Sequence, residues 1–192
     1  MSLELLSAAA RVPTPWRNGG GVTFEIAAEP AGAADFDWRL SLAIIEEEGP
    51  FSDFPGVERT LLVAEGRIEL GVAGRAPRFY DAADEAAQFP GDTPSAALLP
   101  DGPAAALNLM TRRGAWTGTL ERRTVERAAT VICQDITFVL APAGGLSARL
   151  RTERLALDPG DALCVRRARG AMLRLASPHA DEVVVAHVNA VR

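Results

Sequence analysis

Apolar and polar residues alternate along most of this chain in short runs, and glycine, proline or aspartate separates most of these runs. A period of two residues is typical of β-strands with one buried face, whereas the helical period near 3.6 residues is scarce here. One stretch, Asp81–Ala87, is rich in alanine and acidic residues and favours a helical turn. The pattern predicts an all-β protein with strands at Val22–Ala28, Trp38–Ile45, Arg59–Glu65, Arg67–Ala73, Ala105–Thr111, Thr117–Arg122, Ile136–Leu140, Leu146–Thr152, Ala162–Arg166, Ala171–Leu175 and Val183–Val188.

A weak internal repeat divides these strands into two groups. Apolar runs on either side of a glycine occupy residues 61–70 and 138–150, and a Pro-Gly-Asp turn follows each, at residues 90–92 and 159–161. In such a turn proline presets φ, glycine adopts a positive φ and aspartate accepts hydrogen bonds from nearby backbone amides. Two copies predict a bicupin, that is, two fused cupin-like β-barrels or jelly rolls with few short helices. We expect residues 1–112 to form the barrel with the ligand pocket, and residues 113–192 a mainly structural barrel, within one compact unit.

Composition limits the chemistry open to such a fold. All 20 basic residues are arginine, so the Schiff-base, P-loop and general-base roles of lysine are excluded. The two histidines, His179 and His187, are expected to be ordinary strand or loop residues, and no local motif offers three or four metal ligands. We therefore expect no metal and no cofactor. The net charge of −5 is dispersed without a basic run, which argues against nucleic acid as a partner.

The start of the chain and its cysteines bear on location. The first ten residues lack a positively charged segment, and no apolar run approaches the about 18 residues of a membrane span. We therefore expect no signal peptide, no membrane partner and a cytoplasmic location. In that compartment Cys133 and Cys164 are expected to be buried thiols rather than a disulfide.

Three predicted strands carry a sparse set of polar residues on one face, because side chains alternate between the faces of a strand. The polar faces hold Thr23 and Glu25 on one strand, Arg39 and Ser41 on the next, and Asn108, Met110 and Arg112 on a third. Such a face is either solvated or turned into the barrel. A solvated face in this chain would carry more charge, as Glu46–Glu48 do, so we favour a barrel interior that binds a small anionic or polar ligand.

Four sequence blocks follow one another in order: P-W-R-N-G-G-G-V-T-F-E-I-A at residues 15–27, W-R-L-S-L-A-I-I at 38–45, G-P-F-S-D-F-P-G-V-E-R-T-L at 49–61 and N-L-M-T-R-R-G at 108–114. Together these blocks closely resemble the HutD/Ves family. The resemblance implies a bicupin fold, a bacterial cytoplasmic setting and a link to histidine utilisation. It also implies a regulatory role through sensing of a formylated pathway intermediate, and no established catalytic activity. Arg17 stands where the family often has lysine, so a carboxylate there would meet a planar fork of donors.

The segment Trp16–Gly21 places three glycines beside a polar group. In one interpretation Trp16 forms an apolar wall, Arg17 and Asn18 make polar contacts, and the glycine N–H groups approach an anion. In the other, the glycines only allow a tight bulge.

Gly49–Arg59 is expected to be a loop anchored by Phe51 and Phe54, and Arg59 either binds an anionic ligand or pairs with a surface carboxylate. With these assignments the candidate ligand-binding set is complete. It comprises Trp16, Arg17, Asn18, Gly19, Gly20, Gly21, Thr23, Glu25, Arg39, Ser41, Arg59, Asn108, Met110 and Arg112.

Three functions fit these residues. The first is a metal-independent, HutD-like protein that regulates histidine utilisation by sensing a small carboxylate such as a formylated intermediate. The alternative is a metal-free cupin enzyme, a hydrolase or isomerase, with Glu25 as general base and Arg39 or Arg112 stabilising an oxyanion. A third interpretation is an interaction module with a vestigial pocket, in which a homodimer covers the sheet edges.

Overall fold

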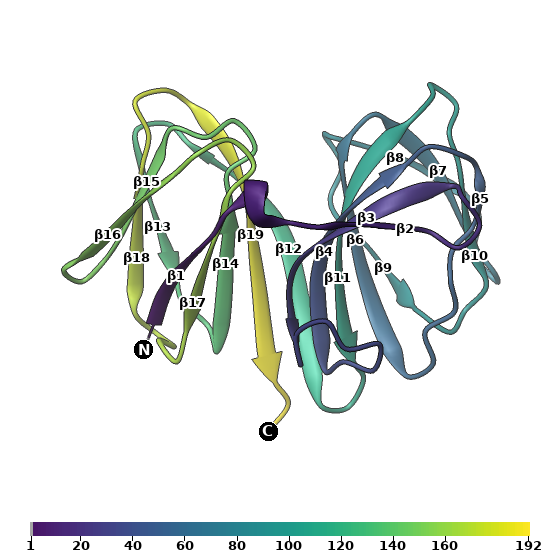
Figure 1. The fold of residues 1–192 in the computed structure, drawn as a ribbon, viewed down its shortest axis with the longest axis horizontal. Helices are drawn as coiled ribbons and strands as arrows, with labels where there is room; N and C mark the ends of the chain where they lie inside the picture. Colours follow the sequence, from purple (N-terminus) through teal and green to yellow (C-terminus); the bar gives the residue numbers. More distant parts are fainter. Residues whose placement is uncertain (1) are drawn as a thin grey trace. The chain divides into compact units, whose positions relative to one another are not determined.

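The computed structural model describes residues 2–192, which divide into two compact units. Val12–Thr117 form one unit, which we name the first barrel. The residues up to Arg11 together with Gly118–Arg192 form the other, which we name the second barrel. Each unit consists of two antiparallel sheets, and the fold is an all-β bicupin (Figure 1).

The first barrel combines a six-stranded and a four-stranded sheet. The large sheet has the order β2-β3-β4-β11-β6-β9, and the small sheet has the order β5-β10-β7-β8. The strands are β2 (Pro13–Pro15), β3 (Gly21–Glu29), β4 (Trp38–Ile45), β5 (Gly49–Pro50), β6 (Val57–Glu65), β7 (Arg67–Val72), β8 (Arg78–Asp81), β9 (Ala87–Pro90), β10 (Ser95–Leu98) and β11 (Ala104–Arg112).

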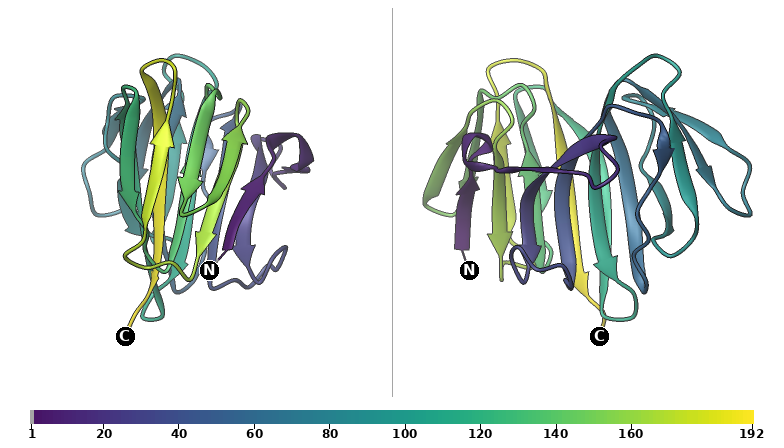
Figure 2. Two further views of the ribbon diagram at one scale, coloured as in Figure 1. Left: turned by 90° about the vertical axis from the view of Figure 1, so that its left-hand side faces the viewer. Right: turned by 45° about the vertical axis from the view of Figure 1, so that its right-hand side comes forward.

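The second barrel combines a five-stranded sheet, β1-β17-β14-β19-β12, with a four-stranded sheet, β13-β18-β15-β16 (Figure 2). Its elements are β1 (Ser2–Leu6), the short 3₁₀ helix η1 (Ala8–Ala10), β12 (Trp116–Val125), β13 (Ala128–Ile132), β14 (Ile136–Leu140), β15 (Leu146–Leu150), β16 (Glu153–Leu157), β17 (Ala162–Arg166), β18 (Met172–Ala176) and β19 (Asp181–Ala190). No helix among residues 2–192 is long and apolar enough to cross a membrane.

The long alternating runs form strands at or near their predicted positions, and three of them, β4, β14 and β17, have the predicted bounds. Strands without a predicted counterpart are short, and several contain proline or glycine, such as Pro13–Pro15 and Gly49–Pro50. The shortest of them, such as Gly49–Pro50, carry too few alternating positions to be read as strands, and only their pairing with a neighbour defines them.

The helical turn predicted at Asp81–Ala87 is wrong. β8 ends at Asp81 and β9 begins at Ala87, and a turn joins them. Asp81 Oδ1 accepts the N–H of Ala83 at 2.8 Å, and Asp84 Oδ2 accepts the N–H of Asp81 at 3.0 Å. Aspartate side chains that bond to nearby amides stabilise turns and compete with helical hydrogen bonds.

The N-terminal segment belongs with the second half of the chain. Strand β1 pairs with β17, although the sequence prediction assigned residues 1–112 to one barrel. The second Pro-Gly-Asp turn holds this segment, because Asp161 Oδ1 accepts the N–H of Ala8 at 2.7 Å and the carbonyl of Gly160 accepts from Arg11 at 2.8 Å. The division between the units falls inside β12, between Thr117 and Gly118.

Each barrel has its own apolar core. In the first barrel Leu61, Ile68 and Phe89 belong to one cluster of buried residues, and in the second Val139 and Leu173 belong to another. Burial of one such side chain contributes about 1.5–3 kcal/mol. Cys133 and Cys164 are free and buried, as predicted, and burial raises the pKa of the Cys164 thiol to about 11.

Candidate functional site

The inner face of the large sheet of the first barrel carries polar side chains among core residues. On β6, Leu61 and Val63 join Ile68 and Leu70 of the opposing sheet in the core. Arg59 lies on the same face of β6, because side chains two residues apart share a face.

Cross-strand pairing places the neighbouring polar residues on this face too. Glu25, Ser41 and Asn108 are directly opposed on β3, β4 and β11, and Asn108 is also opposed to Leu61. Directly opposed residues have Cβ atoms about 4.5–5.5 Å apart. These three side chains therefore form one polar row inside the barrel.

A second row lies two residues further along the strands. Arg39, Met110 and Arg59 are directly opposed on β4, β11 and β6. Two arginines thus lie within the first barrel, next to the row of Ser41 and Asn108. The interior polar cluster, as we define it, comprises Glu25, Arg39, Ser41, Arg59 and Asn108.

Arg59 is 3% exposed and has few hydrogen bonds. Its Nη2 donates to Asn108 Oδ1 at 3.1 Å, whereas Nε and Nη1 are buried without a partner among residues 2–192. The guanidinium carbon lies 4.7 Å from the ring centre of Phe51 and 5.2 Å from that of Phe89. Burial, with a smaller contribution from the charge of Arg39, lowers the pKa of Arg59 to about 10, so the side chain stays charged at neutral pH.

Arg39 is half-buried and has a similar environment. Its Nη2 lies 3.4 Å from Met110 Sδ, and its guanidinium carbon lies 4.5 Å from the ring centre of Phe36 and 5.3 Å from that of Phe54. Its Nε is buried without a hydrogen-bond partner in the described chain. Burial lowers the pKa of Arg39, and the charge of Glu25 opposes this shift.

These contacts define what the cluster can bind. The guanidinium carbons lie over aromatic rings, and the nitrogens without a partner remain as donors for a planar acceptor such as a carboxylate. Ser41, which is 2% exposed, and Asn108 add neutral donors and acceptors beside the charges. The arrangement suits a small anion with one further polar group.

The glycine segment forms a tight turn. The N–H of Gly19 donates to the carbonyl of Trp16 at 3.0 Å, and the N–H of Gly20 donates to Asn18 Oδ1 at 3.2 Å. Gly19 has a φ of 77°, which favours glycine. Two of the glycine amides that the sequence offered to an anion therefore already have partners within the turn.

Gly21 and Trp16 join this turn to the large sheet. A Cβ on Gly21 would lie 2.3 Å from the carbonyl oxygen of Ile44, so only glycine fits there. Trp16 packs against the core, and its Nε1 donates to Thr23 Oγ1 at 2.8 Å, one row beyond Glu25. Arg17 and Asn18 are exposed, and no hydrogen bond or ion pair joins them to the interior polar cluster.

Arg112 contacts the loop between β3 and β4. Its Nη2 donates to the Asp35 carboxylate and, at 2.9 Å, to the carbonyl of Phe36. The same loop is held from the other side, because the N–H of Gly32 donates to Glu25 Oε1 at 3.2 Å. Arg112 therefore positions the loop that carries Phe36 over Arg39.

A cavity of about 270 Å³ lies next to this loop, with Phe36, Phe54 and Arg112 among its lining residues. The rings of Phe36 and Phe54 are 6.1 Å apart and both contact Arg39. The sequence indicated Phe54 through its turn-rich loop, but it held no signal for Phe36 or Phe89. Phe89 is distant along the chain from Arg59, whereas Phe36 lies just before the alternating run that contains Arg39.

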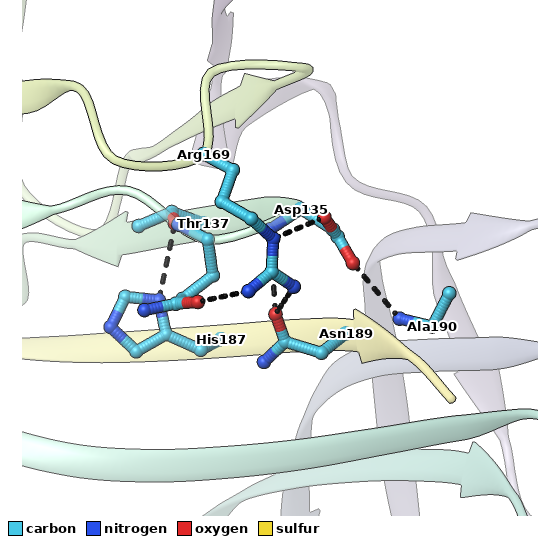
Figure 3. Close-up of polar contacts among 7 residues, drawn as sticks. Asp135, Thr137, Arg169, His187, Asn189 and Ala190 are labelled. Atoms are coloured by element: carbon cyan, nitrogen blue, oxygen red, sulfur yellow. Dashed lines mark hydrogen bonds and ion pairs between the residues drawn. The ribbon is translucent and has the colours of Figure 1, made fainter. Parts of the chain in front are cut away.

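The second barrel contains a different polar cluster, shown in Figure 3. Arg169 donates through Nε to Asp135 Oδ1 at 2.7 Å, through Nη1 to Gln134 Oε1 at 3.1 Å and through Nη2 to Asn189 Oδ1 at 2.7 Å. Asp135 Oδ2 also accepts the N–H of Ala190 at 3.2 Å. This arginine thus has a side-chain acceptor at each of its three nitrogens.

The two histidines lie in different parts of the second barrel and do not form a common site. His187 is directly opposed to Thr137 on β14, and its Nδ1 lies 3.1 Å from Thr137 Oγ1 (Figure 3). His179 lies in the exposed turn before β19. Within residues 2–192 no three side chains of His, Cys, Asp or Glu gather in a way that could hold a metal ion.

Comparison with known proteins gives consistent matches. A sequence model of the HutD family matches residues 8–184. Protein Ves of Citrobacter koseri is 35% identical over 140 residues, which are 71% of this chain and 72% of that protein. The crystal structure of a conserved protein of unknown function from Pseudomonas aeruginosa superposes with a TM-score of 0.89 at 29% identity, covering 98% of this chain and 100% of the other. The structure of HutD from Pseudomonas fluorescens, described as a formate condition, has a TM-score of 0.81 at 25% identity and covers 100% of both chains.

Proposed function

This chain belongs to the HutD family, and from that membership we propose that it is a metal-independent small-molecule-binding protein that senses a small carboxylate. The observation that carries the proposal is the pair Arg39 and Arg59. Both are charged, both lie inside the first barrel, and neither forms an ion pair with a carboxylate among residues 2–192.

Unpaired buried charge is costly. Removal of a charged group from water costs several kcal/mol unless a counter-charge and hydrogen bonds offset it. Here a single neutral oxygen, Asn108 Oδ1, accepts from the buried Arg59. An anionic ligand would supply the missing counter-charge, and a carboxylate could accept two parallel N–H bonds from one guanidinium.

The proposed physiological role is regulation of histidine utilisation in the cytoplasm. It follows from family membership and from the HutD name of the Pseudomonas fluorescens protein. Among the compounds of that pathway, formylated amino acids combine a carboxylate with a polar formyl group, which would meet Ser41 or Asn108.

A thermal-shift titration tests the proposal. Histidine, urocanate, formiminoglutamate, formylglutamate and formate are each added, and a ligand at about 100 times its Kd should stabilise the fold by about 2.7 kcal/mol. Arg59→Met and Arg39→Gln should each abolish the shift. Arg113→Gln is the matched control, because Arg113 pairs with Asp92 on the surface of the same barrel. If no compound shifts the melting temperature, or if both variants keep the shift, the carboxylate-sensing proposal fails.

Glu25 supports a second candidate, a metal-free hydrolase or isomerase. Its carboxylate lies in the same row as Ser41 and Asn108, within the cluster where a ligand would bind. In that case wild type would convert the ligand that the titration identifies, and Glu25→Gln would lose turnover while keeping affinity. Product analysis by NMR checks this. If wild type converts none of the ligand, the enzyme candidate is wrong.

A further inference from the structure

The outer face of the small sheet of the second barrel carries a row of arginines. Arg149 on β15 is directly opposed to Arg154 on β16 and to Arg174 on β18. The residues that alternate with them, such as Leu150 and Leu173, belong to the core, so the arginines point outward. The left view in Figure 2 looks onto this sheet.

Among the described residues of these four strands, none on this face is acidic. Its other positions are small or apolar: Ala128, Thr130, Ile132, Ser147, Ala156, Met172 and Ala176. None of the three arginines forms an ion pair with a residue of the described chain. Like charges directly opposed on a sheet destabilise it, so fold stability does not explain this row.

An exposed apolar pair lies beside the arginines. Ile132 and Met172 are directly opposed on β13 and β18 and are 49% and 57% exposed. Arginine and methionine are enriched in protein–protein interfaces, whereas acidic residues are depleted there. We refer to Arg149, Arg154, Arg174, Ile132 and Met172 together as the arginine face.

We propose that the arginine face docks an acidic segment of a partner protein, with carboxylates on the arginines and an apolar side chain on Ile132 and Met172. The positive charge of the arginine face determines which kind of partner it can bind. A second copy docked by the same face would oppose the arginine row to itself, as two-fold symmetry requires. Single-stranded nucleic acid would need aromatic side chains on which bases stack, and this face has none.

Fluorescence anisotropy with two labelled peptides tests the proposal on the full chain. One peptide alternates Glu with Leu, and the other has Gln in place of each Glu. The Glu peptide should bind, the Gln peptide should bind at least about tenfold more weakly, and salt raised from about 50 to about 200 mM should weaken the Glu peptide alone.

The variant Arg154→Glu/Arg174→Glu changes two exposed side chains and should lower the affinity for the Glu peptide at least about tenfold. Arg154→Lys/Arg174→Lys should restore most of the affinity, because the charge returns. Arg67→Glu is the matched control, since Arg67 is an exposed strand arginine of the first barrel, and it should have no effect.

Three results would overturn the proposal. They are equal binding of the Glu and Gln peptides, equal weakening by Arg67→Glu, and tighter binding of a single-stranded oligonucleotide than of the Glu peptide. The last would identify a nucleic-acid surface instead. None of these outcomes depends on the ligand of the first barrel.

Discussion

Arg59 in the first barrel and Arg169 in the second differ in how their charges are satisfied. Arg59 is almost fully buried among phenylalanine rings and donates one hydrogen bond, to a neutral amide oxygen. Arg169 lies at the surface and bonds Asp135, Gln134 and Asn189. The first keeps two buried nitrogens, Nε and Nη1, without a partner among residues 2–192, while the second joins loops and the end of β19. Two barrels of one fold therefore surround the same type of side chain in opposite ways.

The two barrels also differ in overall charge. The first holds eight of the 20 arginines and 16 of the 25 carboxylates, and the second holds twelve and nine. The net charge of −5 is therefore the sum of −8 for the first barrel, which is acidic, and +3 for the second, which is basic. A basic surface that no run of the sequence reveals is present in the second barrel.

The largest expected contrast comes from replacing each arginine with methionine. Arg59→Met should leave the free energy of unfolding without ligand unchanged or raise it by about 1–4 kcal/mol, because an unpaired buried charge is removed. Arg169→Met should lower it, because Asp135 loses its partner. Urea denaturation checks both, and a strong destabilisation by Arg59→Met would show that its charge is satisfied within the fold.

The two Pro-Gly-Asp turns give the next contrast. Asp161 is 4% exposed and accepts from the N–H groups of Ala8 and Asp158, so Asp161→Ala should cost about 3 kcal/mol. It should also release the N-terminal segment, detected as faster hydrogen exchange at Ala8. Asp92→Ala should cost much less, because Asp92 is exposed. Urea denaturation measures the free energy of unfolding of both variants, and an equal decrease in the two would contradict this order.

Acid should act through different groups in the two barrels. Arg113 and the Gly56 amide hold the pKa of Asp92 at about 2, so its contribution is complete above the ordinary value and is lost as the pH falls towards 2. Burial lowers the pKa of His187, near Glu121 and Arg123, so the neutral form is favoured and stability falls as the pH drops below about 6.5. In His187→Gln, melting temperatures between about pH 7 and 5 should depend less on pH.

The smallest effect concerns the outer sheet faces. Arg174→Thr removes one of three opposed charges and should stabilise the fold by about 0.2–1 kcal/mol. Arg67→Thr should not stabilise, because Arg67 lies 4.3 Å from the ring centre of Phe79. Melting curves of the two variants compare the two sheet faces. A lower melting temperature of Arg174→Thr than of wild type would mean that the arginine row stabilises the sheet.

Alternation predicted the long strands well, because burial of one face imposes a period of two on the sequence itself. It also placed Glu25, Ser41 and Asn108 on a shared polar face, where register aligns them in one row. Short edge strands such as β5 and β8 were not predictable, because they exist only through pairing with a neighbour.

By itself the sequence determined the fold class, the family and the polar face of the first barrel, since each rests on residues close together in the chain. The tertiary structure alone decided how the charges are used. It joined the N-terminal segment to the second barrel, and it placed Phe54 beside Arg39 and Phe89 beside Arg59. It also aligned three distant arginines on one face. Burial and charge pairing depend on which segments meet in space, and no local pattern encodes that.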